Sequence, residues 1–273
     1  MRIEKYFGAE RETLRGLIAA SRKMTSTRSG SNRTYRTKVF LFDEYALLKM
    51  RNIRLRNVVV QDRNLRHLES LAKTLLDLQA QGVGVVPILA FRSDGILLMA
   101  RAKGAELYEK DRLDEKNYVL RRVKFLSNVP QAYYDKFAAD AIKITDAGVL
   151  VDFVGKDNFF YDETVGFQFV DLDAHNDYFY GLSDQKPQSK AIAARICFLP
   201  CWYDTTPTYR ETVSALLAQL TPAEHTALTA HNRAIFVKCR LALERSAVPE
   251  AIIQETLADE RFIPQKQQVG LLP

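Results

Sequence analysis

The fold prediction depends most on one stretch in the middle of the chain, Asp152-Phe153-Val154-Gly155-Lys156-Asp157-Asn158. Two short runs rich in aromatic residues follow it, 159–161 and 166–170, with turn-forming residues between them. This pattern predicts two short antiparallel strands. Asn158 begins the hairpin, and Asp171 follows it thirteen positions later. Asn158 and Asp171, brought together by one hairpin, would make an oxygen site that suits Mg²⁺, whereas the alternative is an ordinary turn with polar ends.

The residues before this stretch predict a small β-rich part with one long helix. Short apolar segments indicate strands at 35–42, 45–50, 83–91 and 95–100. A helix is predicted over 58–81, where apolar residues recur at helical spacing and Gly82 marks the end. Residues 2–23 also show a helical pattern and predict one or two amphipathic helices. Residues 25–32 are rich in turn formers and predict a loop.

The rest of the chain is predicted to be mainly helical, with one helix over 131–147 and others from about residue 187 to 258. The fold class expected from this order of elements is α+β. The predicted organisation has four parts: a helical N-terminal extension (1–23), a β-rich part (24–100), a connector (101–104) and a helical part (105–273).

In this order of elements, and in the run Tyr45-Ala46-Leu47-Leu48-Lys49, the sequence resembles the protein-kinase superfamily. It is similar to divergent bacterial members of this superfamily, such as atypical, small-molecule or lipopolysaccharide kinases. The likeness covers about residues 24–200 and implies a two-lobed kinase-like fold with its hinge at 101–104. It also implies ATP and Mg²⁺ as cofactors and phosphoryl transfer to a hydroxyl acceptor, on a protein or a small molecule, whose identity the motifs do not specify.

The resemblance implies a role for each candidate site residue. Lys49 would bind the α- and β-phosphates of ATP, and Glu69 would hold Lys49 by an ion pair. Asp152 would orient the acceptor hydroxyl. The other implied contacts are Gly30 and Ser31 at the phosphates, Met99, Ala100 and Ala102 at the adenine, and Asn158 and Asp171 at Mg²⁺.

The sequence departs from the kinase pattern in two places. The pattern puts the catalytic Asp five residues before the Asn, whereas Asp152 lies six before Asn158. Three interpretations remain open: Asp152 still reaches the substrate, Asp157 or Asp173 replaces it as the base, or the protein is a pseudokinase without a base. Asp173 is also a candidate for a second metal ligand. Gly30 is the single glycine of the expected phosphate loop. These departures favour the alternative function, an effector-type binding module that acts by protein contact. An unrelated α+β nucleic-acid binder is the third interpretation.

The charge and composition restrict the partners. The net charge is +6, and much of the excess lies in the first half, at Arg28, Arg33, Arg36, Lys38, Lys49, Arg51, Arg54 and Arg56. Such a face suits an acidic partner, whereas the motifs expected of a nucleic-acid-binding protein are missing. No apolar run reaches the roughly 18 residues that predict a membrane span. The three cysteines at 197, 201 and 239 predict buried, reduced thiols and a cytoplasmic location; export through a specialised secretion system would leave no mark in these features.

Overall fold

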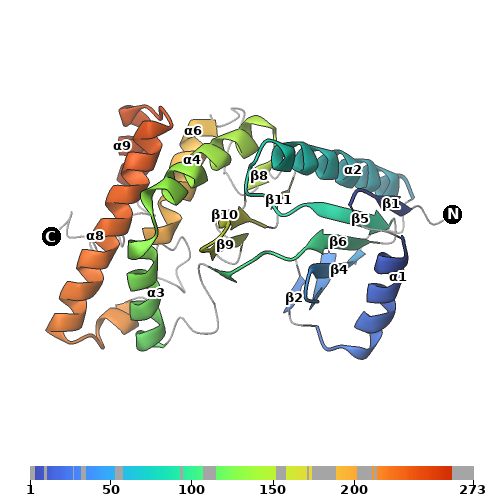
Figure 1. Ribbon diagram of the computed structural model, residues 1–273, viewed down its shortest axis with the longest axis horizontal. Coiled ribbons are helices and arrows are strands. Elements are labelled where there is room, and N and C mark those ends of the chain that lie inside the picture. Colours follow the sequence, from blue (N-terminus) through green and yellow to red (C-terminus); the bar gives the residue numbers. More distant parts are fainter. Residues whose placement is uncertain are drawn as a thin grey trace. The chain divides into compact units, whose positions relative to one another are not determined.

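The computed structural model describes residues 4–8, 11–26, 28–31, 35–52, 58–92, 95–106, 115–151, 158–170, 172–173, 189–201, 211 and 214–259. The chain is α+β, as expected, and divides into two compact units, Met1–Lys103 and Gly104–Pro273. The boundary between the units falls inside the connector predicted at 101–104. The first unit contains the large sheet, and the second contains most of the helices (Figure 1).

The first unit is built on a six-stranded antiparallel sheet in the order β1-β5-β6-β4-β3-β2. Its strands are β1 (Glu4–Tyr6), β2 (Arg28–Ser31), β3 (Tyr35–Leu41), β4 (Tyr45–Asn52), β5 (Ile88–Arg92) and β6 (Ile96–Ala100). The hairpin expected around Asp43 and Glu44 is confirmed: the Phe42 amide donates to the Tyr45 carbonyl at 2.8 Å, and β3 pairs with β4 beyond this turn.

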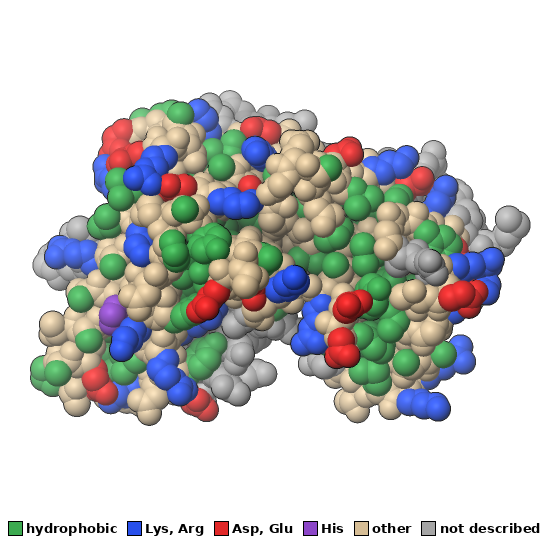
Figure 2. All heavy atoms as spheres, in the orientation of Figure 1, with side chains coloured by type: hydrophobic (Ala, Val, Ile, Leu, Met, Phe, Trp, Pro, Cys, Tyr) green, Lys and Arg blue, Asp and Glu red, His purple; other side chains and the backbone are tan. Residues whose placement is uncertain are grey.

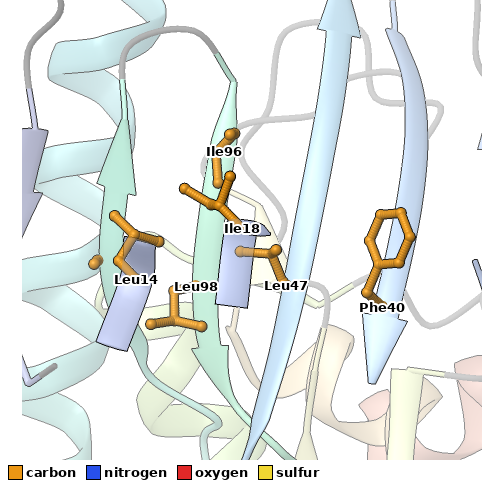
Figure 3. Close-up of a cluster of buried hydrophobic side chains, with 7 residues drawn as sticks. Leu14, Ile18, Phe40, Leu47, Ile96 and Leu98 are labelled. Carbon is orange, nitrogen blue, oxygen red and sulfur yellow. The ribbon is translucent and has the colours of Figure 1, made fainter. Parts of the chain in front are cut away.

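Helix α1 (Arg11–Ala20) covers one face of this sheet. Its buried residues Leu14 and Ile18 belong to a cluster whose other members come from the strands: Phe40, Leu47, Ala90, Ile96 and Leu98 (Figure 3). A short 3₁₀ turn, η1 (Ser21–Lys23), continues the helix. Successive side chains in a strand point to opposite faces. The strand residues of this cluster therefore define the α1 face of the sheet.

Helix α2 (Val58–Ala80) covers the opposite face, as Figure 1 shows. Its described buried residues are Leu71, Ala72, Leu75 and Leu78. Lys5 follows Glu4 and precedes Tyr6 in β1, so its side chain points away from α1, and it forms an ion pair with Glu69 of α2. The helix predicted over 58–81 is thus confirmed to within one residue at its C-terminal end.

The strand predicted over 83–91 begins only at Ile88, and two other segments of the first unit form strands that the sequence did not predict. Residues 4–6, predicted as helix, form β1 and pair antiparallel with β5. Residues 28–31, predicted as part of a loop, form β2 and pair with β3. In both cases the segment joins the edge of a sheet whose open backbone groups accept a further strand. Pairing with a neighbour overrides a weak local preference, because β-propensity depends strongly on context.

The second unit is mainly helical in its described part, which agrees with the sequence prediction. Its long elements are α3 (Lys116–Asn128), α4 (Gln131–Asp146), α6 (Ser189–Cys197), α8 (Pro222–Arg245) and α9 (Glu250–Ala258). A short 3₁₀ turn, η4 (Leu199–Cys201), follows α6. Figure 2 shows acidic and basic side chains side by side over α8 and α9, where Arg240 pairs with Glu244 and Glu250. None of the helices in the described ranges has the length and apolar character needed to cross a bilayer.

The predicted aromatic hairpin is confirmed in the second unit. It consists of β9 (Phe159–Asp162) and β10 (Gly166–Phe169), and β7 (Ala105–Glu106) adds a third strand beside β9. Phe137 of α4 packs on the hairpin, with its ring centroid 5.0 Å from that of Phe169 and 5.8 Å from that of Phe159. These aromatic contacts fix the strands against a long helix.

The three cysteines are free and buried, as predicted. Cys197 is the last residue of α6, Cys201 is the last residue of η4, and Cys239 lies on α8. Burial raises the pKa of the Cys197 thiol well above its ordinary value. The described residues contain no group of three His, Cys, Asp or Glu side chains with metal-binding geometry. The thiols therefore act as small apolar groups in the core of the unit.

Candidate functional site

Lys49 lies on the α1 face of the sheet. It follows Leu47 by two positions in β4, and Leu47 is fully buried in the cluster under α1. Side chains two apart in a strand share a face. The Nζ atom of Lys49 lies 4.9 Å from the centroid of the Phe40 ring, which belongs to the same cluster. The ammonium group is therefore held against an aromatic ring at the border of the core.

The electrostatic surroundings of Lys49 are positive. Partial burial lowers the pKa of Lys49 from its ordinary value, and the nearby charges of Arg22, Arg92 and Lys38 lower it further. Both causes act in the same direction, because each disfavours the protonated ammonium group. In the described part of the chain, no carboxylate forms an ion pair with Lys49. An anion brought to this place would meet the positive charges of Lys49, Lys38 and Arg22.

Glu69 does not contact Lys49. Its carboxylate lies 3.5 Å from the Nζ atom of Lys5 and 3.8 Å from that of Lys73, and its side chain is 27% exposed. Because α2 covers the face of the sheet opposite α1, Glu69 and Lys49 are on different sides. The two residues that the kinase resemblance pairs are therefore separated by the sheet, and Lys5 takes the place beside Glu69.

The segment at Gly30 and Ser31 forms regular strand rather than loop. Gly30 pairs with Thr37 and Ser31 with Arg36 in the β2–β3 ladder. Residues 32–34, between these strands, lie outside the described residues. A phosphate-binding backbone at Gly30 and Ser31 would use groups at the edge of the sheet, since β2 is its last strand.

The predicted adenine-binding segment begins at the end of β6. Met99 lies within this strand opposite Ala46 and Ile88. The Ala100 amide donates to the Pro87 carbonyl at 3.2 Å, and the Arg101 amide donates to the Glu44 carbonyl at 2.9 Å. Two of the amides near the expected adenine position are thus engaged in the fold. An adenine base at this segment would rely on the Ala102 backbone and on carbonyl groups.

Asn158 is buried at the start of the aromatic hairpin, with 5% of its surface exposed. Its carbonyl oxygen accepts a hydrogen bond from the Val170 amide at 2.9 Å. This bond closes the hairpin directly before Asp171. Asp152, Asp157 and Asp171 lie outside the described residues, and the structure describes only the backbone of Asp173.

A second pair of short strands lies beside these positions. Strands β8 (Leu150–Val151) and β11 (Leu172–Asp173) run antiparallel, with Val151 opposite Leu172 and Leu150 opposite Asp173. Val151 is the residue before Asp152, and Leu172 is the residue after Asp171. The immediate neighbours of both aspartates are therefore paired, next to the bond that joins Val170 to Asn158.

No known protein family has a model that matches this chain, and no curated protein matches its sequence. The interpretation of the site therefore depends on the residues and their geometry.

The cationic neighbours of Lys49 were not predicted as site residues. Lys38 could have been identified from the hairpin: a two-residue turn at Asp43 and Glu44 pairs Phe42 with Tyr45, and counting outward pairs Lys38 with Lys49. Arg22 and Arg92 carry no comparable signal. Their positions depend on the packing of α1 and on the pairing of β5, which are contacts between segments distant in the sequence.

Proposed function

We propose that the protein is a kinase-like phosphotransferase of two lobes that binds ATP and Mg²⁺ and transfers a phosphoryl group to a hydroxyl acceptor. The observation that supports it is the double pairing in the second unit. Val151 pairs with Leu172, and the Val170 amide donates to the Asn158 carbonyl. These contacts surround Asp171 on both sides and place its neighbours beside those of Asp152 and Asn158. We propose that Asp152, Asp171 and the Asn158 amide meet beside these contacts, because two acids and an amide suit Mg²⁺ and a hydroxyl acceptor.

In this proposal each residue has a defined task. Asn158 and Asp171 bind Mg²⁺, which neutralises charge on the phosphates, and Asp152 orients the acceptor hydroxyl. Lys49 binds the α- and β-phosphates, and the Phe40 ring, rather than Glu69, holds its side chain in place. Met99, Ala100 and Ala102 contact the adenine. The burial of all three thiols is compatible with action in the cytoplasm.

Calorimetric titration with ATP, with and without Mg²⁺, tests this function. The wild-type chain is expected to bind ATP more tightly with Mg²⁺, and Asp171→Ala is expected to lose that Mg²⁺-dependent gain. Lys49→Met is expected to weaken binding about tenfold under both conditions, as loss of one charged contact predicts. Glu163→Gln removes an exposed carboxylate from the same hairpin and serves as the matched control. Release or transfer of labelled γ-phosphate, abolished in Asp171→Ala, would establish catalysis.

A second candidate function is a binding module that acts by contact with an acidic partner. The observation that favours it is the separation of Glu69 from Lys49, because kinases use that ion pair to position the lysine for transfer. Binding of ATP without any release or transfer of its γ-phosphate would support this alternative. Failure to bind ATP under either condition would exclude the phosphotransferase.

A further inference from the structure

We propose that the α1 face of the sheet binds two adjacent phosphate groups through Arg22, Lys38 and Lys49. This inference builds on the proposed function, since it takes a polyphosphate as the ligand of Lys49. It adds the place where the phosphates bind, and it makes the N-terminal segment, which lies outside the kinase resemblance, part of the site.

The register of the sheet places cations in one row. Lys38 lies directly opposite Lys49, Lys49 opposite Ile96, and Ile96 opposite Arg92. Residues directly opposite in antiparallel strands point to the same face, with Cβ atoms about 5 Å apart. The adjacent row on that face contains Phe40, Leu47, Leu98 and Ala90, which pack under α1. The cationic row therefore borders the apolar cluster, and Ile96 belongs to both.

Arg22 reaches the same region from a different part of the chain. Ile18 packs in the cluster with Phe40 and Leu47, and the Ser21 hydroxyl donates to the Ile18 carbonyl at 2.8 Å. Ser21 is buried, so η1 is held against the sheet, and Arg22 is the next residue. The charge of Arg22 is the strongest of the charges that lower the pKa of Lys49. Three elements thus direct positive charge to one location.

Clustered like charges are unfavourable unless an anion compensates them. Within the described ranges, Arg22, Lys38 and Lys49 form no ion pair with a carboxylate. Glu4 lies at the end of the row, opposite Arg92, whose charge is one of those that lower the pKa of Glu4, and the Glu4 carboxylate also accepts from the Tyr6 hydroxyl at 2.6 Å and pairs with Arg11 at 3.3 Å. Glu4 forms no ion pair with Arg22, Lys38 or Lys49 in the described part of the chain. The cluster therefore keeps a positive charge that a phosphate group would neutralise.

The dimensions of the cluster favour a compact ligand. Lys38 and Lys49 are on adjacent strands, which lie about 4.8 Å apart, and Arg22 approaches from the helix side. This arrangement matches the phosphates of a nucleotide or of pyrophosphate, whose charges are close together. A nucleic-acid strand would need a groove that follows its backbone over several nucleotides.

The test is calorimetric titration of the full chain with pyrophosphate, ATP and adenosine, all without Mg²⁺. Wild type is expected to bind pyrophosphate and ATP but not adenosine. Arg22→Gln and Lys38→Gln are each expected to weaken pyrophosphate binding about five- to tenfold, with a smaller loss at high salt. Lys23→Gln is the matched control: it removes the same charge from the same turn, and its effect is expected to stay below twofold. Circular dichroism spectra verify that each variant is folded.

The outcomes separate this inference from the proposed function. If ATP with Mg²⁺ binds and requires Lys49, but Arg22→Gln and Lys38→Gln bind pyrophosphate as wild type does, the inference fails and the phosphotransferase survives. If pyrophosphate binding depends on all three cations while no γ-phosphate transfer occurs, the inference holds and the phosphotransferase fails. Equal losses in Lys23→Gln, or binding of oligo(dT) without binding of pyrophosphate, would overturn the inference in favour of a diffuse basic surface.

Discussion

The Nζ atom of Lys5 lies 3.5 Å from the Glu69 carboxylate, which links the first strand of the sheet to helix α2. Lys49 lies on the other face, against Phe40. The arrangement gives each lysine a different environment. Lys5 has an acidic partner at the surface, whereas Lys49 is partly desolvated among other cations.

The first prediction concerns Glu69. Glu69→Gln is expected to leave the affinity for ATP or pyrophosphate within twofold of wild type, because its carboxylate contacts Lys5 and Lys73 instead of Lys49. The loss of stability is expected to be small, about 0–1 kcal/mol, since these ion pairs are partly exposed. Titration and urea unfolding measure the two effects. A loss of binding as large as that of Lys49→Met would show that Glu69 and Lys49 do meet when the ligand binds.

The second prediction compares two glycines with positive φ. Gly104 has φ +80°, and a Cβ atom there would lie 2.6 Å from the Tyr161 carbonyl carbon and 2.8 Å from Asp162 Cβ. Gly82 has φ +75°, but no atom lies within 4 Å of such a Cβ. Gly82→Ala is expected to cost about 1–2 kcal/mol in backbone strain alone. Gly104→Ala is expected to cost clearly more, because β7 would be forced away from β9. Equal costs in urea unfolding would contradict the close approach at Gly104.

The third prediction concerns acid stability and Glu224. Lys116 pairs with its carboxylate at 2.6 Å, and the Thr221 amide donates to it at 2.8 Å in the capping box of α8. These contacts, the Lys116 contact first, lower the pKa of Glu224 to about 2 from 4.5. A lowered folded-state pKa gives stability that is complete above about pH 4.5 and is lost as the pH falls towards 2.

Glu224→Gln is therefore expected to lower the Tm at pH 7, and the difference from wild type is expected to shrink between pH 4.5 and 2. Thermal unfolding followed by circular dichroism measures this change. Glu255→Gln, which removes an exposed carboxylate from α9, is the control. A difference that stays constant down to pH 2 would show that the charge of Glu224 is not the cause.

The fourth prediction concerns Lys238, whose Nζ donates to the carbonyls of Ser127 at 2.8 Å and Val129 at 2.5 Å. These carbonyls lie at the C-terminal end of α3, where a positive charge is favourable. Lys238→Met is expected to destabilise the protein by about 1–3 kcal/mol, because it leaves partly buried acceptors unpaired. Lys143→Met, at an exposed position of α4, is expected to have little effect. Urea unfolding measures the stability of both variants. Similar stabilities would argue against the capping role of Lys238.

Local patterns predicted much of this fold. The helical period of 58–81, the hairpin around Asp43 and Glu44, and the aromatic hairpin after Asn158 all appear at or near their expected positions. Each depends on side-chain spacing within one segment or on one short turn, which the sequence contains directly. Apart from β1 and β2, the order of the elements in the first unit follows from the same patterns.

The sequence alone did not show on which face of the sheet each residue lies. Alternation in β4 shows that Leu47 and Lys49 share a face, but not whether α2 or α1 covers it. That choice depends on contacts such as Lys5 with Glu69 and Ile18 with Leu47, which join segments far apart in the chain. For the same reason Arg22 was not predicted as a neighbour of Lys49, and β1 was predicted as helix.

The pairing of Tyr6 with Ala90 joins the beginning of the first unit to its fifth strand. During translation, a ribosome must synthesise and release the chain as far as β5 before β1 can pair, which makes this a contact of high sequence separation. Until then the apolar side of α1 lacks strands β5 and β6 as its cover. Nascent chains that end before β5 therefore lack part of the apolar cover of Leu14 and Ile18, which a chaperone that binds apolar segments would recognise.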